Sequence, residues 1–444
     1  MLSDLDKIAA IRAAFPREGL FAEKDWLVSP EPFPLDAATV AELEKLGHRL
    51  NTFVRACNEL YNLSAAGRQP GWIAEYLDRG KPRGLIDFAR DRMFRDAVPQ
   101  VIRPDIVLTE NGFTIAELDS VPGGIGLTAW LNKTYSQLGA DVIGGADGMI
   151  EGFRSIFPEG DILVSREAAT YKPEMEWLCE TRNAERGTRS ETPAWKVADA
   201  EDYTVPSSPF RVPSSVYRFF ELFDLPNIGS AQSLMESALR GDIRITPPIK
   251  PWMEEKMWLA LFWMRPLREY WRRALRENHF LALQKMIPYS WIVDPTPLPQ
   301  HAAIPRLDIH DWRELAAFSQ KERALILKIS GFSEFAWGSR AVFLGQDMPH
   351  AEWRAAIERA LTGFDAHPFV LQEFHKGKLF EHPYLDPASG SIRTMQGRVR
   401  LCPYYFTAEN ETRLGGVLAT ICPADKKLLH GMKDAIMVPC ALAN

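Results

Sequence analysis

An arginine and three carboxylates stand at spacings that suit metal and phosphate chemistry. Arg103 and Asp105 lie two residues apart, and Glu117 and Asp119 lie two apart further along the chain. Between the two pairs, the residues 110–112 read Glu-Asn-Gly and predict a hairpin, because Asn-Gly favours tight turns between strands. Residues two apart on a strand point to the same face. The hairpin would therefore bring Asp105 beside Glu117 and Asp119.

Carboxylates held this closely repel one another unless a cation neutralises them. Mg²⁺ prefers hard oxygen ligands and commonly takes phosphate oxygens in its remaining positions. The pattern therefore predicts Asp105, Glu117 and Asp119 as Mg²⁺ ligands. Arg103 would face a phosphate or a developing negative charge. A solvent-facing hairpin whose charges point outward is an alternative that the spacing leaves open.

A dinucleotide-binding fingerprint is a second alternative. Gly124-x-Gly126-x-x-Ala129 follows a predicted strand, as the glycines of that fingerprint do. Four residues, 119–122, separate the strand from the glycines, however, and the fingerprint normally follows its strand directly. Two carboxylates beside a pyrophosphate would also be unfavourable without a metal. The fingerprint is therefore the weaker interpretation of this segment.

Length and composition are those of a folded protein with several domains. The chain has 444 residues, which predicts two or three domains. Its 46% hydrophobic and 25% charged residues are ordinary for a soluble protein. The formal net charge of −6 gives no electrostatic reason to expect a nucleic-acid partner.

Cysteines and apolar stretches argue against several other classes. The five cysteines are scattered and form no Cys-x-x-Cys pair, so neither a zinc site nor a disulfide framework is predicted. The first fifteen residues carry acidic side chains and lack a continuous apolar segment, unlike a signal peptide. The most apolar run, Met257 to Met264, is far too short to span a bilayer. We therefore expect a cytoplasmic protein without a membrane partner.

The spacing of apolar residues predicts both helices and strands. Residues 1–100 are expected to be mainly helical, with the clearest helical spacing at 36–60. A small α/β domain is expected next, from a strand at 161–165, a helix at 173–181, a strand within 195–203 and a helix at 216–223.

The remaining third of the chain is predicted in the same way. Residues 251–285 form a long helical region broken near Pro266. Residues 286–299 are expected to be a loop or an edge segment, because prolines remove backbone donors. The elements predicted after them are a helix near 308–321, strands at 324–329 and 341–344, a helix at 350–362, a strand at 369–374 and a strand pair at 391–421.

The order of these motifs resembles that of the ATP-grasp superfamily. The segment Arg-x-Asp, then Glu-x-Asp followed by Pro-Gly-Gly, is similar to the metal-binding strands of its circularly permuted, glutathionylspermidine synthase-like members. In those members the segment precedes the nucleotide-binding lobe and reads Arg-x-Asp and Glu-x-Asn. Asp119 stands here in place of the Asn, which keeps an oxygen ligand and adds charge. The resemblance implies an α+β, circularly permuted ATP-grasp fold that uses ATP and Mg²⁺.

The resemblance also implies which downstream residues contact ATP. Residues 254–263 resemble the start of a helix that carries the first ATP-contacting lysine. This lysine would be Lys256, and Lys250 and Lys285 are the alternatives. Residues 324–342 resemble the strand, lysine and flexible loop that hold the phosphates, although the loop carries bulky aromatic side chains. Residues 369–374 resemble the hinge whose backbone pairs with adenine. The implied nucleotide-binding residues are Lys256, Lys328, Ser330, Gly331, Gly338, Ser339, Arg340, Gln372, Glu373 and Phe374.

The implied activity is that of an ATP-dependent carboxylate–amine ligase. A substrate carboxylate would take the γ-phosphate to form an acyl phosphate, which Arg103 would stabilise, and an amine would then displace phosphate. Both substrates would be small molecules or peptides. A kinase of the same fold and a non-catalytic ATP-binding protein are the alternatives. The expected segments are a helical N-terminal segment (1–100), the metal-binding strands (101–155), an additional α/β substrate domain (156–245) and the nucleotide-binding lobes (246–444).

Overall fold

The predicted hairpin forms in the computed structural model of the protein. β2 (Val101–Thr109) pairs antiparallel with β3 (Gly112–Asp119), and Thr109 lies opposite Gly112 at the turn. Gly112 has a φ of 116°, a backbone conformation that favours glycine because glycine has no Cβ. The Asn-Gly turn therefore ends one strand and starts the next, as the sequence predicts.

The structure describes residues 2–16, 26–186, 194–205, 214–336, 340–429 and 434–443. They contain both helices and sheets, so the fold is α+β. The chain forms two compact units, each assembled from separate segments. The first unit comprises residues 1–52, 97–249 and 376–444, and the second comprises 53–96 and 250–375. Each unit thus combines residues that are far apart in the sequence.

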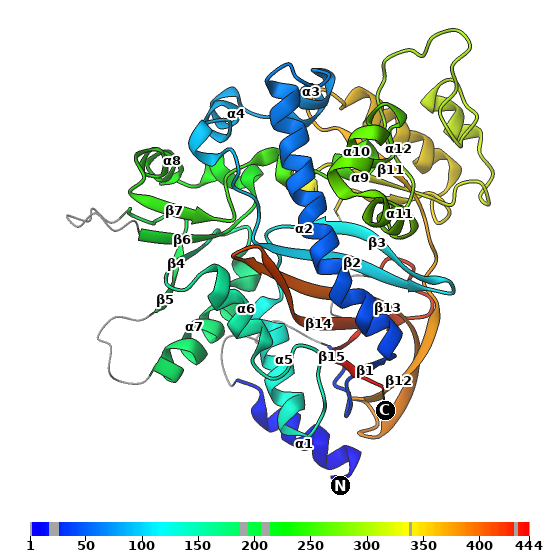
Figure 1. Ribbon diagram of the computed structural model, residues 1–444. Coiled ribbons are helices and arrows are strands. Elements are labelled where there is room, and N and C mark those ends of the chain that lie inside the picture. Colours follow the sequence, from blue (N-terminus) through cyan, green and yellow to red (C-terminus); the bar gives the residue numbers. More distant parts are fainter. Residues whose placement is uncertain are drawn as a thin grey trace. The chain divides into compact units, whose positions relative to one another are not determined.

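A seven-stranded sheet is the main feature of the first unit (Figure 1). Besides β2 and β3 it contains β1 (Phe33–Leu35), β12 (Leu379–Leu385), β13 (Ile392–Ala408), β14 (Glu411–Pro423) and β15 (Ile436–Leu442). The order is β1-β15-β14-β13-β2-β3, and β12 pairs with β13. The β13–β14 pair confirms the strand pair predicted at 391–421. It also brings the C-terminal part of the chain beside the hairpin.

Two helices pack closely on this sheet. α5 (Ile125–Gln137) and α6 (Gly148–Ile156) both contact β14, and α6 also contacts β13. A Cβ at Gly152 would meet the Phe406 ring at 2.2 Å. The backbone of α6 therefore approaches the sheet at a distance that a larger side chain would prevent.

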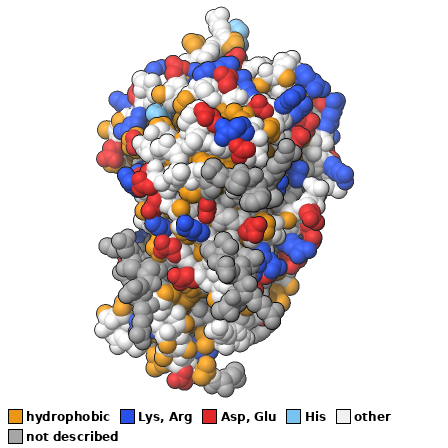
Figure 2. All heavy atoms as spheres, turned by 90° about the vertical axis from the view of Figure 1, so that its left-hand side faces the viewer, with side chains coloured by type: hydrophobic (Ala, Val, Ile, Leu, Met, Phe, Trp, Pro, Cys, Tyr) orange, Lys and Arg blue, Asp and Glu red, His pale blue; other side chains and the backbone are white. Residues whose placement is uncertain are grey.

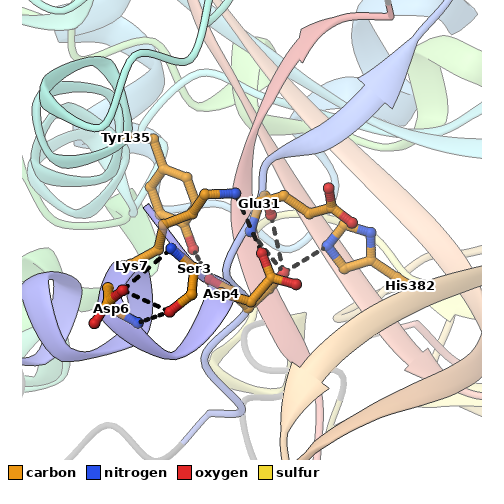
Figure 3. Close-up of polar contacts among 8 residues, drawn as sticks. Ser3, Asp4, Asp6, Lys7, Glu31, Tyr135 and His382 are labelled. Carbon is orange, nitrogen blue, oxygen red and sulfur yellow. Dashed lines mark hydrogen bonds and ion pairs between the residues drawn. The ribbon is translucent and has the colours of Figure 1, made fainter. Parts of the chain in front are cut away.

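The two N-terminal helices begin at polar caps. α1 (Asp4–Ala14) follows Ser3, whose hydroxyl accepts a hydrogen bond from the Asp6 amide while the Asp6 carboxylate accepts one from Ser3 (Figure 3). α2 (Ala37–Ala65) follows Asp36, whose carboxylate accepts a hydrogen bond from an amide of the first turn at 2.7 Å. The helix predicted at 36–60 is confirmed, and capping explains where it starts.

A buried histidine of β12 contacts the segment that precedes β1 (Figure 3). His382 Nε2 lies 3.0 Å from the Ser29 hydroxyl, and the Tyr135 hydroxyl of α5 donates to the Ser29 carbonyl at 2.7 Å. Burial lowers the pKa of His382 from 6.5 to about 4, because a charged imidazolium is poorly solvated in the interior. The folded protein therefore keeps this imidazole neutral in mildly acidic solution.

We expect His382 to reduce stability as the pH falls. Between pH 6.5 and about 4 the unfolded chain binds a proton at this side chain that the folded chain does not. The free energy of unfolding therefore decreases as the pH falls through that window, by about 3 kcal/mol at most. Urea unfolding at about pH 7 and about pH 4.5 should show a weaker pH dependence for His382→Gln than for the wild type. Equal pH dependence in both proteins would contradict the assignment.

The first unit also contains a four-stranded parallel sheet of order β5-β4-β6-β7. The strand predicted at 161–165 and the strand predicted within 195–203 are confirmed as two of its members. Its elements are β4 (Gly160–Val164), η2 (Ala169–Tyr171), α7 (Lys172–Arg186), β5 (Trp195–Asp199), β6 (Ser214–Phe219), η3 (Leu222–Asn227), α8 (Ala231–Arg240) and β7 (Ile243–Thr246).

The helix predicted at 216–223 is wrong. This segment contributes strand β6 and then the start of the 3₁₀ turn η3. Val216, Tyr217 and Phe219 are buried in an inner strand between β4 and β7. Inner strands of parallel sheets read as continuous apolar runs, which are difficult to distinguish from a short buried helix by periodicity.

The second unit contains a smaller sheet of order β10-β9-β11-β8, whose pairs are all antiparallel. Its strands are β8 (Ser290–Ile292), β9 (Leu325–Ile329), β10 (Val342–Leu344) and β11 (Phe369–Glu373). Its helices are α3 (Trp72–Asp78), α4 (Arg83–Ala89), η1 (Arg92–Phe94), η4 (Pro251–Glu254), α9 (Met257–Trp263), η5 (Arg265–Leu267), α10 (Arg268–Leu275), α11 (Glu277–Met286), η6 (Trp312–Ala317), η7 (Glu334–Ala336) and α12 (His350–Thr362).

Most predictions for this unit are confirmed. The helical region at 251–285 is interrupted by η5 at Pro266, and the proline-rich segment at 286–299 supplies only the short edge strand β8. The helix predicted near 308–321 is wrong in length, since only the 3₁₀ helix η6 forms there. The core of the second unit contains apolar residues of the sheet and of α12, including Trp291, Leu327, Trp353 and Leu371.

In the part of the chain that the structure describes, no helix combines the length and the apolar character needed to cross a membrane.

Candidate functional site

In the first unit, the register of the hairpin brings the predicted side chains together. Asp105 lies opposite Glu117, and Arg103 lies opposite Asp119. Arg103 Nη2 is 2.9 Å from Asp119 Oδ2, and its Nε is 3.4 Å from Asp105 Oδ1. The third guanidinium nitrogen, Nη1, donates to the Gly123 carbonyl at 2.9 Å. Arg103 is therefore held between two of the three carboxylates.

A second arginine reaches the same carboxylates from β13. Arg400 Nη1 is 3.1 Å from Asp105 Oδ2, and the Cys402 thiol is 3.4 Å from Asp105 Oδ1. The buried Nε of Arg400 has no hydrogen-bond partner among the described residues. This nitrogen is suited to a further acceptor, such as a phosphate oxygen. We refer to Arg103, Asp105, Glu117, Asp119 and Arg400 as the hairpin cluster.

Burial and charge act in opposite directions within the hairpin cluster. Burial raises the pKa of the Asp119 carboxyl. The positive charge of Arg103 lowers this pKa, whereas the negative charges of Glu117 and Asp105 raise it further. Burial alone would lower the pKa of Arg103, but the nearby Asp119 and Asp105 carboxylates raise it well above its ordinary value. The carboxylate repulsion expected from the sequence is thus offset in part by two arginines.

The described residues contain no group of three or more His, Cys, Asp or Glu side chains arranged to hold a metal ion. Two arginines pair with these carboxylates: Arg103 with Asp105 and Asp119, and Arg400 with Asp105. The donor types of the hairpin cluster nevertheless fit Mg²⁺, because carboxylate oxygens on paired strand positions are hard ligands. The assignment of Asp105, Glu117 and Asp119 as metal ligands stays a prediction.

The glycine segment after β3 argues against dinucleotide binding. α5 begins after Gly124, whose amide donates to Glu174 Oε1 at 2.6 Å, and the Leu127 amide donates to Glu174 Oε2 at 3.1 Å. Glu174 is fully buried, and a Cβ at Gly126 would lie 2.1 Å from its carbonyl oxygen. A protein carboxylate therefore already occupies the helix N-terminus that a pyrophosphate would need.

Removing this carboxylate should destabilise the first unit. Glu174→Ala leaves two buried amides without an acceptor, which is expected to lower the free energy of unfolding by about 2–3 kcal/mol. Glu176→Ala changes an exposed carboxylate on the same helix and is expected to alter it by less than about 0.5 kcal/mol. Chemical denaturation of both variants measures the difference, and equal effects would contradict the capping role.

In the second unit, Lys328 lies on the inner strand β9, and its ammonium group starts a chain of hydrogen bonds between side chains. Lys328 Nζ donates to Gln372 Oε1 at 3.1 Å, and Gln372 Nε2 donates to the Ser290 hydroxyl at 3.1 Å. All three side chains are buried. The predicted phosphate lysine is thus in direct contact with Gln372, a residue of the predicted hinge.

Ser330 and Gly331 follow Lys328 at the end of β9 and contact a buried carboxylate. The Ser330 hydroxyl donates to Glu255 Oε2, and the Gly331 amide donates to the same oxygen at 3.3 Å. The other carboxylate oxygen of Glu255 pairs with Lys81, which precedes α4. Lys81, Glu255, Ser330 and Gly331 form what we call the Glu255 cluster.

The other predicted nucleotide contacts are spread over the second unit. Lys256 is half-buried just before α9, and Arg340 is exposed before β10. Gly338 and Ser339 lie outside the described residues. Of the alternative lysines, Lys285 is exposed at the end of α11. Lys250 is buried and donates to the Asn58 side chain and the Arg95 carbonyl, each at 2.9 Å, which favours a structural role for it.

The predicted hinge uses its backbone donors within the protein. The Glu373 amide donates to the Tyr289 carbonyl and the Phe374 amide to the Ala324 carbonyl, each at 2.9 Å. The Glu373 carboxylate pairs with Arg306 at 2.8 Å on the surface. An adenine contact at this segment would therefore have to use the carbonyl oxygens, rather than these two amides.

Several contacts in these clusters were not predicted from the sequence. Arg398 and Arg400 are two residues apart on one strand, a spacing that could have indicated a charged site. Only Arg400 belongs to the hairpin cluster, because Arg398 donates to the backbone carbonyls of residues 377, 424 and 426. Glu174 and Lys81 lie in segments without a recognisable motif. Glu255 directly precedes Lys256, but no local pattern indicated that it is buried.

Comparisons with known proteins identify a fold and no family. No protein-family model matches the chain, and no curated protein matches it. A glutathione synthetase-like effector from Globodera pallida, solved in its apo form, matches with a TM-score of 0.56 at 10% identity, over 99% of this chain and 96% of that chain. A putative γ-glutamylcysteine synthetase from Methylobacillus flagellatus KT has a TM-score of 0.42 at 11% identity, over 90% of this chain and 87% of that chain.

At such identities a structural likeness concerns the fold alone. The first of these structures shares its fold with this chain over nearly the whole length of both. That likeness is consistent with the α+β, ATP-grasp-like fold predicted from the sequence.

Proposed function

We propose that this protein is an ATP-dependent ligase that joins a carboxylate to an amine in a Mg²⁺-dependent reaction. The observation that carries the proposal is the hairpin cluster. Arg103 and Arg400 pair with Asp105, Arg103 also pairs with Asp119, and Glu117 lies opposite Asp105 on the neighbouring strand. The fold agrees with this function, because a structure that matches over nearly the whole chain is named a glutathione synthetase-like effector.

The proposed reaction needs little covalent help from the protein. The substrate carboxylate attacks the γ-phosphorus of ATP, and ADP leaves as an acyl phosphate forms. The amine then attacks the acyl carbon and displaces inorganic phosphate, giving an amide. The catalytic contribution of the side chains is to position these groups and to stabilise negative charge.

The lysine, the arginines and the carboxylates have different parts in this reaction. Lys328 and the residues after it bind the phosphates, and Arg103 stabilises the acyl phosphate. Arg400, which pairs with Asp105, contributes to the same stabilisation of negative charge. Asp105, Glu117 and Asp119 would hold the Mg²⁺, which supplies neutralisation of phosphate charge when bound.

The order of the segments supports a circularly permuted, glutathionylspermidine synthase-like arrangement. The metal-binding hairpin at 101–119 comes before the proposed nucleotide-binding strands at 325–329 and 369–373. We assign substrate binding to residues 156–245, which include most of the parallel sheet β5-β4-β6-β7. Loops at the ends of parallel strands commonly bind ligands.

The expected partners are a carboxylate and an amine, each a small molecule or a peptide. On the face shown in Figure 2, acidic and basic side chains are interspersed, and the net charge is −6. Neither feature favours a nucleic-acid partner. A cytoplasmic setting fits the proposal, because ATP is available there and the five cysteines are buried thiols.

The test is a screen of acid and amine pairs for ADP release by the full chain with Mg-ATP. A ligase releases ADP and inorganic phosphate only when both substrates are present, and it forms an amide that mass spectrometry detects. Release of ADP without inorganic phosphate would indicate a kinase instead. Binding of ATP without turnover for any pair would indicate a non-catalytic nucleotide-binding protein.

A further inference from the structure

A buried carboxylate in the second unit lies among three donors that come from two segments of the chain, residue 81 and residues 330–331. The Lys81 ammonium and the Ser330 hydroxyl both contact the Glu255 carboxylate, and the Gly331 amide donates to it at 3.3 Å. The side chains of Lys81 and Glu255 are 0% and 1% exposed. The three donors therefore form a binding site for an anion that is shielded from water.

The types of these donors are those that bind phosphate. An ammonium group, a hydroxyl and a backbone amide at the end of a strand together satisfy several oxygens of one phosphate group. Ser330 lies two residues after Lys328, the predicted phosphate lysine, so the donors continue that segment. At Gly331 a Cβ would lie 1.8 Å from the Glu254 carbonyl oxygen. Only glycine therefore allows the backbone to approach the 254–255 segment this closely.

We propose that Lys81, Ser330 and the Gly331 amide form a phosphate subsite for the nucleotide and that the Glu255 carboxylate competes with phosphate for these donors. The proposal rests on the nucleotide binding proposed above. It adds Lys81 to the phosphate contacts and makes the Glu255 carboxylate a competitor of phosphate within the protein. A phosphate group carries more negative charge than a carboxylate and offers three acceptor oxygens. It can therefore replace Glu255 on the same donors without any covalent change.

The geometry also implies how the exchange takes place. Because Glu255 and Lys81 are buried, a phosphate enters only when the segment at 330–331 separates from the Glu255 carboxylate. Binding of the nucleotide and release of Glu255 are then coupled, and the carboxylate lowers the apparent affinity for phosphate. If the ion pair were purely structural, removing Glu255 would weaken the fold around it and would not tighten phosphate binding.

The decisive variant is Glu255→Gln, which keeps the shape of the side chain and removes its charge. We expect the full-length variant to bind ADP and inorganic phosphate roughly tenfold to a hundredfold more tightly than the wild type in isothermal titration calorimetry. Adenosine, which has no phosphate, should bind both proteins equally. The double variant Lys81→Met with Glu255→Gln should lose the gain. Unchanged or weaker ADP binding by folded Glu255→Gln would overturn the proposal.

Ser330→Ala is the second test, and it decides the matter if Glu255→Gln does not fold. We expect it to weaken ADP binding by roughly tenfold while adenosine binding is unchanged. Unchanged ADP binding by Ser330→Ala would overturn the proposal. Both tests are separable from the ligase assignment. If the variants change ADP affinity as expected but no amide forms, only the ligase assignment is rejected. If an amide forms but the variants do not change ADP affinity, only the phosphate subsite is rejected.

Discussion

Replacing Glu117 by alanine is expected to reduce turnover by roughly three orders of magnitude, while nucleotide binding is only moderately weakened. Glu117 lies opposite Asp105 on the neighbouring strand, so its removal deletes one of three proposed Mg²⁺ ligands. Groups that stabilise the charge of a transition state typically contribute a hundredfold to a thousandfold each. The adenine contacts predicted at residues 372–374 do not involve this side chain. Mg²⁺-dependent ADP release and ATP titration calorimetry measure the two effects separately.

Two further variants control this experiment. Glu110→Ala removes an exposed carboxylate at the turn of the same hairpin and should leave turnover unchanged. Asp119→Asn should be the mildest change within the hairpin cluster, because the amide oxygen can still accept from the Val121 amide, as Asp119 Oδ1 does at 2.9 Å. Wild-type turnover in Glu117→Ala would remove the metal assignment.

Replacing Lys328 by alanine is expected to weaken ATP binding by roughly tenfold to more than a hundredfold. The loss of one charge-assisted contact to phosphate costs about 1.5–3 kcal/mol, which corresponds to that range of affinity. Lys328→Ala also removes the donor to Gln372 Oε1, so the fold of the variant must be compared with that of the wild type. Titration calorimetry with ATP and thermal unfolding without ligand provide the two measurements.

The matched control for Lys328 is Lys321→Ala. Lys321 is exposed and lies shortly before β9 in the same unit, so its loss changes the net charge without removing a buried donor. We expect its ATP affinity to equal that of the wild type. If Lys328→Ala also binds ATP with unchanged affinity and remains folded, Lys328 has no contact with the phosphates.

Much of the local structure could be predicted because it depends on neighbours in the sequence. The Asn-Gly turn determined where β2 ends and β3 begins, and two-residue periodicity placed the carboxylates on their strands. The position of the helix at 36–60 followed from periodicity, and a capping carboxylate defines its start. The segment at 216–223 could not be assigned in this way, because its apolar run suits a short buried helix and an inner strand alike.

Contacts between distant residues were decided by the tertiary structure. Arg400 reaches Asp105 across 295 positions of sequence because β13 pairs with β2, and no local pattern determines which strands become neighbours. Glu174 caps α5 across 50 positions, and Glu255 meets Lys81 across 174.

The sequence by itself therefore determined the types of chemical group and the local elements that carry them. The tertiary structure alone decided which charges neutralise one another. The physical reason is that an ion pair depends on the distance in space between two groups, and the packing of the whole unit sets that distance.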